Sequence, residues 1–107
     1  MAAQSDNAPI LDLLAKMTAA SLDASGLDEQ TLMLVRIAAL VSVDAPPASY
    51  MLNLAAAGES GIDVDQVQGV LAGVAPIVGT PRIVSAAAKM IRALDLKLEL
   101  GDLALEE

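Results

Sequence analysis

Two polar residues in this sequence could take part in chemistry. Tyr50 is the only aromatic residue among 107, and Arg82 falls in the first turn of an expected helix, where the helix dipole disfavours a cation. A guanidinium can hold a carboxylate, and a phenol can donate a proton in a reaction. The structural alternative is a buried tyrosine and a surface arginine.

Arg36 is a third candidate, because it is the single charge in a second, otherwise apolar helix. It could bind an anion, or it could form an ion pair or extend its charged end to the surface at an interface. In a lyase or isomerase acting on a small carboxylated substrate, Arg82 or Arg36 would hold the carboxylate. Tyr50, Asn53 or Asp44 would then polarise or protonate the reacting carbon.

The chain has no cysteine and no histidine. This composition excludes disulfides, thiol catalysis, zinc sites with thiolate or imidazole ligands, and Ser-His triads. Glu59, Asp63 and Asp65 lack the spacing of a calcium loop, and helix capping accounts for Asp63. Gly69 and Gly73, four residues apart on one helix, indicate close approach to another helix rather than a phosphate loop. We therefore expect no cofactor and no metal ion.

Charge and hydropathy bear on the possible partners. The net charge is −8, from 14 acidic and 6 basic residues, and phosphate repulsion then argues against nucleic-acid binding. No apolar run approaches the ~20 residues of a membrane span, since Arg36 and Gln68 interrupt the two longest. The N-terminus shows no secretory pattern, so a cytoplasmic location is expected.

The periodicity predicts an all-α protein of five helices, in a single domain over residues 9–95 that follows a flexible N-terminal tail, 1–8. The first helix is expected to end near Ser21. In the third, Pro46 and Pro47 are confined to the first turn, where missing amide donors matter little. The five starts are marked by residues that cap or open a helix, namely Pro9, Asp28, Asp44, Asp63 and Thr80-Pro81.

The stretch 61–94 organises the predicted fold. A capping box at Asp63 starts one apolar stripe, and Gly79 stops that helix. A second apolar stripe runs from there to Leu94. Because the link is so short, the two helices are expected to pack as an antiparallel hairpin.

The last residues change character. From Leu94 to Leu100, leucines alternate with Asp95, Lys97 and Glu99, a period of two rather than 3.6. This alternation favours an extended segment, so residues 96–107 are predicted to form an extended acidic tail.

The apolar content predicts assembly. Hydrophobic residues make up 55% of the chain, although only 1% is aromatic. The mean hydropathy is +0.58, which is high for a small soluble chain. A chain of this size cannot bury that much apolar surface in one core. We therefore expect burial between subunits, in a homo-oligomer.

The order of several short motifs is that of a known family. Each motif is weakly specific alone, but their order along the chain is more specific. The motifs are Leu27–Thr31, Gly61–Asp63, Val70-Leu71 and Pro76–Arg82. From Leu27 to about Leu94 the chain resembles the carboxymuconolactone decarboxylase-like family, which includes the alkylhydroperoxidase D-type proteins. The resemblance implies an all-helical fold that assembles as trimers or hexamers.

The redox motif of that family is missing from this sequence. The peroxidase branch carries C-x-x-C-x-x-x-H at the start of the third helix, and those positions fall on Pro46, Ser49 and Asn53. The accompanying glutamate falls near Leu34. The histidine of the decarboxylase branch is likewise replaced by Asn53. The resemblance thus implies the fold without thiol-dependent peroxidase activity.

Two functions of different class stay open. The absent cysteines and histidine, the apolar excess and the alternating tail favour a non-redox oligomeric binding or assembly module. The alternative is a decarboxylase-like lyase or isomerase acting on a small carboxylated substrate, with Tyr50, Asn53 and Arg82 as candidate catalytic residues. If those three converge in one enclosed, partly polar pocket, the enzyme is favoured, whereas separation favours the module.

Overall fold

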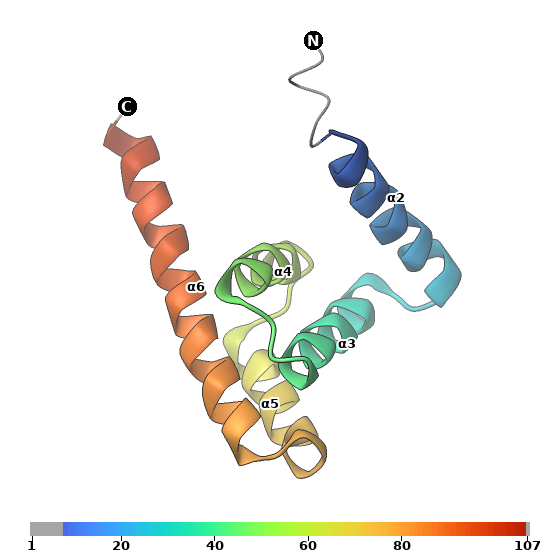
Figure 1. Ribbon diagram of the computed structural model, residues 1–107, viewed down its shortest axis with the longest axis vertical. Helices are drawn as coiled ribbons and strands as arrows, with labels where there is room; N and C mark the ends of the chain where they lie inside the picture. Colours follow the sequence, from blue (N-terminus) through green and yellow to red (C-terminus); the bar gives the residue numbers. More distant parts are fainter. Residues whose placement is uncertain (1–7, 107) are drawn as a thin grey trace.

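The computed structural model describes the backbone of residues 8–106 and the side chains of residues 9–94. Within that range every regular element is a helix, which confirms the predicted all-α class with five helices (Figure 1). The helices are α2 (Ala8–Ser25), α3 (Glu29–Ser42), α4 (Pro47–Glu59), α5 (Val64–Val78) and α6 (Thr80–Glu106). The first helix is longer than predicted, since it continues past Ser21 to Ser25. The predicted tail 1–8 lies outside the described residues except for Ala8, which begins α2.

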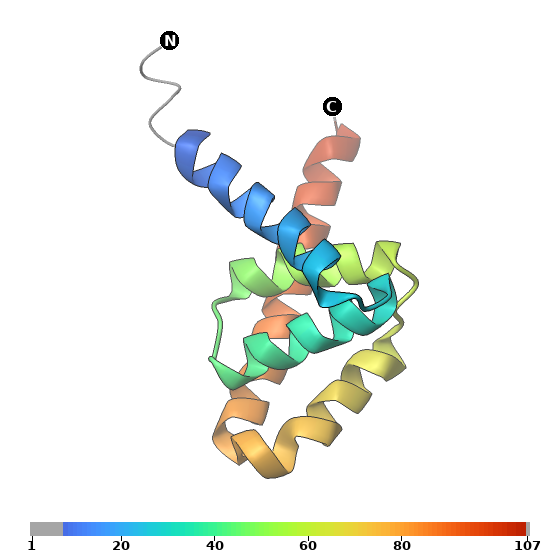
Figure 2. The same ribbon diagram turned by 90° about the vertical axis from the view of Figure 1, so that its right-hand side faces the viewer.

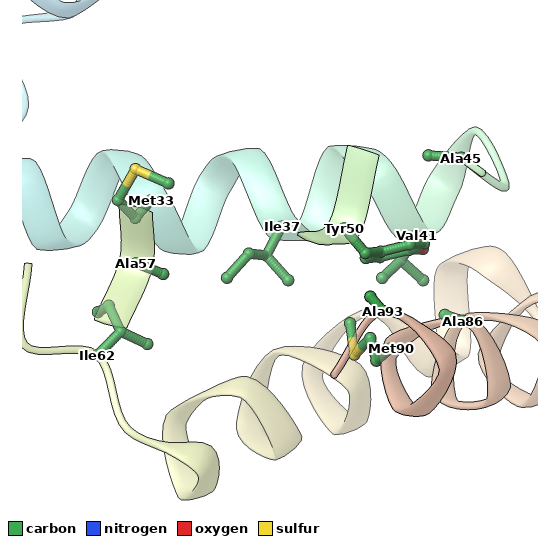
Figure 3. Close-up of a cluster of buried hydrophobic side chains, with 10 residues drawn as sticks. All are labelled: Met33, Ile37, Val41, Ala45, Tyr50, Ala57, Ile62, Ala86, Met90 and Ala93. Carbon is green, nitrogen blue, oxygen red and sulfur yellow. The ribbon is translucent and has the colours of Figure 1, made fainter. Parts of the chain in front are cut away.

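The core lies around α3, which packs against both α4 and α5, while α6 packs chiefly on α4. The largest side chains with no exposed surface are Ile37, Val41 and Tyr50. Figure 3 shows them together with Met90 and Ala93 of α6. Alanines at several contacts let the helix axes approach closely, as expected for a chain with one aromatic residue.

Two of the predicted helix starts are confirmed by their hydrogen bonds. Asp28 caps α3, where its carboxylate accepts from the Thr31 amide at 2.8 Å. Asp63 caps α5 in a complete capping box, because the Gln66 amide donates to Asp63 and the Gln66 side chain accepts from the Asp63 amide. Each bond satisfies an amide that the first turn of a helix would otherwise leave unpaired.

The predicted cap at Asp44 is wrong. The N-cap of α4 is Pro46, which makes no side-chain capping bond, and Pro47 is the first helical residue. Asp44 lies in the preceding turn with a positive φ of 54°, a conformation that aspartate tolerates better than most residues. The residue before a proline is driven out of the helical region, so two consecutive prolines delay the start of α4. The Asp44 carboxylate is thereby free to reach another helix.

The α5–α6 hairpin is more open than predicted. Gly79, with a positive φ of 89°, separates the two helices by one residue. From this turn the helices diverge, and Figure 2 shows them as the two arms of a V. Their main partners differ, since α5 packs on α3 and α6 packs on α4. The apolar stripes of α5 and α6 therefore meet near the turn and separate beyond it.

The extended conformation predicted for residues 96–107 is wrong over the described residues. Helix α6 continues without interruption to Glu106, and only Glu107 lies outside the description. An alternation of period two also places leucines four residues apart, which is helical spacing. Leucine, lysine and glutamate all favour helix, and a single glycine at 101 lowers the stability of a helix by only about 1 kcal/mol.

Helix α2 extends away from the other four. It contacts α3 near the link Gly26–Asp28, and its first turns lie clear of the other helices in both ribbon views (Figures 1 and 2). Gly26 has a positive φ of 65°, which lets the chain turn sharply after α2. The Arg36 guanidinium donates to the Thr18 carbonyl at 3.3 Å and ties α2 to α3. This contact fits the structural interpretation of Arg36 rather than anion binding.

Candidate functional site

A polar cluster joins the α3–α4 turn to the middle of α6. One carboxylate oxygen of Asp44, Oδ1, accepts a hydrogen bond from Ser85 Oγ at 2.7 Å and one from Lys89 Nζ at 2.9 Å. Lys89 Nζ also lies 3.3 Å from the Asp44 carbonyl oxygen. Ser85 and Lys89 lie four residues apart, on one face of α6. Asp44, Ser85 and Lys89 are called the Asp44 cluster below.

The hydrogen bond from Lys89, followed by that from Ser85, holds the pKa of the Asp44 carboxyl below its usual value. Partial desolvation opposes this shift, while the charges of Lys89 and Arg82 add to it. Asp44 is therefore ionised at neutral pH and already bonded to its neighbours. In this state it holds the turn against α6 and has no proton to give to a substrate.

Arg82 lies beside this cluster, one turn before Ser85. Its guanidinium donates to the carbonyl oxygen of Ser42, the last residue of α3. That carbonyl belongs to the negative end of the α3 dipole, where a cation is favourable. The placement that looked unfavourable at the start of α6 is thus explained by the end of α3. Arg82 as a whole residue is exposed.

Tyr50 lies under the same turn, within the core. Its side chain has no exposed surface, and its hydroxyl has no hydrogen-bond partner among the residues that the structure describes. Burial raises the pKa of the Tyr50 phenol, and the Asp44 charge adds to this effect. A phenol whose ionised form is disfavoured in this way is a packing residue with an uncompensated polar atom.

Asn53 takes no part in the Asp44 cluster. Its amide group donates to the Ser49 carbonyl of its own helix at 2.9 Å, in a half-buried position. The three positions that correspond to the family's redox motif, Pro46, Ser49 and Asn53, fall along one side of the start of α4. Among the described residues, no hydrogen bond links Asn53 to Tyr50 or Arg82.

Ser85 and Lys89 were not among the site residues predicted from the sequence. Lys89 lies well before the end of α6, which continues to Glu106, so the helix dipole does not account for its charge. The available signal was the spacing of Arg82, Ser85 and Lys89, which puts three polar side chains on one face of α6. Their partners on the α3–α4 turn lie about 40 residues earlier in the chain, as the 40-residue separation between Arg82 and Ser42 shows.

A cavity lies elsewhere, between the diverging arms of α5 and α6. It has a volume of about 350 Å³, opens to solvent, and is floored by Leu54 and Ala57 of α4. We call it the α5–α6 groove. Its remaining lining is apolar except for Asp63 and Gln68 and comprises Ile62, Val64, Val67, Leu71, Ala87, Met90, Ile91 and Leu94. Tyr50, Asn53 and Arg82 do not line it.

No group of three or more acidic, histidine or cysteine side chains lies close enough to hold a metal ion in the part of the chain that is described. Asp63, considered above for calcium, is occupied by its capping bonds to Gln66. Gly69 and Gly73 have no atom within 4 Å of where a Cβ would stand, so the close helix approach predicted for them does not occur within this chain. Across residues 8–106, no helix has the combined length and apolar content needed to cross a bilayer.

These observations define a small all-α protein with an open apolar groove and a polar cluster that fastens a turn. Residues 8–93 match the model of the Carboxymuconolactone decarboxylase family, and the chain belongs to that family. The match confirms the resemblance and extends it through α2. Searches of curated proteins and of solved structures gave no match.

Proposed function

We propose that this protein is a non-redox, homo-oligomeric binding and assembly module of its family. The observation that carries the proposal is the contrast between the two sites. The α5–α6 groove is open and apolar, whereas Arg82 and Asp44, two of the groups that could have been catalytic, are engaged in holding the fold.

The exposed apolar surface supports assembly. Among residues 9–94, fifteen large hydrophobic side chains are exposed in the isolated chain, and Ile77, Val43 and Val64 are 87%, 72% and 71% exposed. A soluble monomer does not usually expose so many large apolar side chains. Burial between subunits would remove this surface from water, and a trimer, or a hexamer built from trimers, is the state we expect.

The alternative function, a lyase or isomerase acting on a small carboxylated substrate, has one supporting observation. Arg82 and Lys89 bring two cations to the same surface, beside Asp44. Both cations are bonded to the α3–α4 turn, and the groove does not include them. A carboxylated substrate would have to displace these bonds, so we favour the module.

Sedimentation velocity of the purified chain, over a range of micromolar concentrations, tests the proposal. We expect a single species with three or six times the 10.9 kDa mass of the chain. A stable species of the chain mass over the whole range would overturn the proposal. Exposure to small carboxylates, followed by product analysis, addresses the enzyme alternative in the same preparation.

A further inference from the structure

We propose that helix α2 of one copy of this chain occupies the α5–α6 groove of a second copy. The inference rests on the proposed homo-oligomer and assigns the two surfaces that form its contact. It commits to a second copy as the occupant of the groove. The grounds are an unpartnered apolar helix face, a groove of matching length, and opposite charges beside them.

The first surface is the apolar stripe of α2. Ile10, Leu13, Leu14 and Met17 have the spacing i, i+3, i+4 and i+7 of one helix face, and they are 59%, 57%, 51% and 56% exposed. This is the spacing of the anchor residues by which an amphipathic helix docks into an apolar groove. Because these turns of α2 extend from the body, the whole stripe is accessible (Figures 1 and 2).

The second surface is the groove, and its dimensions suit the stripe. Its walls run from Val64 to Leu71 on α5 and from Ala87 to Leu94 on α6. Each wall, like the stripe, spans about 10 Å at 1.5 Å per helical residue. The volume is about 350 Å³. Since an apolar cavity of about 150 Å³ accommodates benzene, this groove has room for roughly two branched side chains.

Charge beside the two surfaces is complementary. Lys16 is the only cation of α2 and lies next to Met17, at the side of the stripe. At the start of α5, Asp63 lines the groove, and Asp65 is exposed two residues later. An inserted α2 would therefore bring a cation to an acidic rim, which favours the docked orientation over one with Lys16 turned away.

The occupant comes from another copy because α2 cannot reach its own groove. The link Gly26–Asp28 is short, and the Arg36 bond to Thr18 holds α2 on α3. The groove is formed by α4, α5 and α6, and in Figure 1 the start of α2 and the helix α6 lie on opposite sides of the molecule. A contact between two different surfaces of identical chains is head-to-tail, and it closes into a ring when the rotation permits.

Two substitutions on the contact, each with a matched control, test the inference. Ile91→Asp changes the groove at a side chain that is 64% exposed, and Val84→Asp changes an equally exposed side chain, 63%, of the same helix outside the groove. Leu14→Asp changes the stripe, and Leu22→Asp changes α2 away from it. We expect Ile91→Asp and Leu14→Asp to give the chain mass by sedimentation, while both controls keep the wild-type mass.

Mixing the two defective variants gives a result that misfolding cannot imitate. The Leu14→Asp chain keeps an intact groove, and the Ile91→Asp chain keeps an intact stripe. Each pair can therefore form one good contact and no more, so we expect a 1:1 dimer of twice the chain mass. Circular dichroism of each variant alone should retain the helical signal of the wild type.

Thiol crosslinking provides a second measurement, because the native chain has no cysteine. A mixture of the single variants Leu14→Cys and Ile91→Cys should give a disulfide-linked heterodimer on mild oxidation, and Leu14→Cys mixed with Val84→Cys should give much less. The inference would be overturned if Ile91→Asp kept the wild-type mass and the Leu14→Cys and Ile91→Cys variants formed no disulfide-linked heterodimer. The proposed homo-oligomer would then still stand. A wild-type monomer would overturn both. Loss of binding of an apolar dye in Ile91→Asp without loss of assembly would make the groove a small-ligand site instead.

Discussion

Lys89, in the middle of α6, and Asp44, in the turn before α4, form a 2.9 Å ion pair between positions 45 residues apart in the sequence. The pair explains the unusual backbone at Asp44, whose positive φ of 54° lies in the turn that brings its carboxylate to α6. It also fastens the α3–α4 connection at the place where Arg82 covers the end of α3. The family fold is thus held by polar contacts beside the position of the redox motif.

Lys89→Met should lower the free energy of unfolding at neutral pH. It should also make that free energy depend less on pH in the acid range. The pKa of Asp44 is depressed in the folded state, so its contribution is fully present above the ordinary aspartate value of about 3.9 and is lost as pH falls through the lower folded value. Removing Lys89 removes the largest cause of the depression. Urea unfolding between pH 7 and pH 2 measures this. Arg92→Met, one turn later on α6, is the charge-matched control and should keep the wild-type acid dependence.

Tyr50→Phe should be neutral or stabilising by up to about 1 kcal/mol, because it removes a buried hydroxyl that has no partner in the described part of the chain. Tyr50→Ala should instead destabilise by about 3–5 kcal/mol through loss of the ring from the core. Denaturant midpoints of the three proteins decide this. A loss of more than 1 kcal/mol in Tyr50→Phe would mean that the hydroxyl has a partner in solution.

The same tyrosine should govern stability in alkali. Because its pKa is raised in the folded protein, its contribution is complete below the unfolded value of about 10 and is lost as pH rises from there toward the folded value. Tyr50→Phe should therefore unfold less readily than the wild type above pH 10. Equal alkaline unfolding curves would contradict the burial of an un-ionised phenol.

Gly61→Ala and Gly69→Ala should have opposite effects. Gly61 has φ 90°, and a Cβ there would stand 2.9 Å from Gln30 Nε2, which itself donates to the Ser60 carbonyl. Alanine at this position should cost about 1–2 kcal/mol from the backbone alone. Gly69 lies within α5 with open space around it, so alanine there should stabilise the chain by about 0.5–1 kcal/mol. Thermal unfolding at one protein concentration compares the pair, and destabilisation by Gly69→Ala would indicate that another copy covers this position.

The protein should show no thiol-dependent peroxidase activity. That reaction needs a thiolate to attack the peroxide and a second thiol to resolve the sulfenic acid, and the chain has no cysteine. The two corresponding positions hold Pro46 and Ser49, and no histidine is present to activate the serine hydroxyl. Peroxide consumption in the presence of a dithiol should equal the rate without protein. Turnover that Ser49→Ala abolishes would refute this expectation.

Structural features that depend only on residues close together in the sequence, such as helix caps, could be predicted from the sequence. Asp63 and Gln66 are three residues apart and satisfy each other, so the start of α5 needed no information from elsewhere in the chain. The role of Asp44 could not be predicted in this way. Its local sequence resembles a helix cap, but its partners lie on α6, and only the packed structure brings them to it.

The C-terminal half of α6 was mispredicted for a different reason. Alternating leucines have a period of two, which is compatible both with a strand and with leucines spaced four apart on a helix. The pattern alone does not separate these two structures. The intrinsic helix preference of the intervening residues, and the absence of a stop signal after Leu94, were the better indicators. The α5–α6 groove could not be predicted from the sequence either, because it is created by the divergence of α5 and α6 rather than by any motif.

The burial of Tyr50 makes the chain its own optical reporter. With no tryptophan and no phenylalanine, all aromatic absorbance and ultraviolet emission come from one ring, and that ring lies at the junction of α3, α4 and α6. Its near-ultraviolet dichroism therefore follows the integrity of this junction, without interference from the exposed helix α2 or from the groove. If a variant sediments with a lower mass while its Tyr50 spectrum is unaltered, its subunits have separated without unfolding.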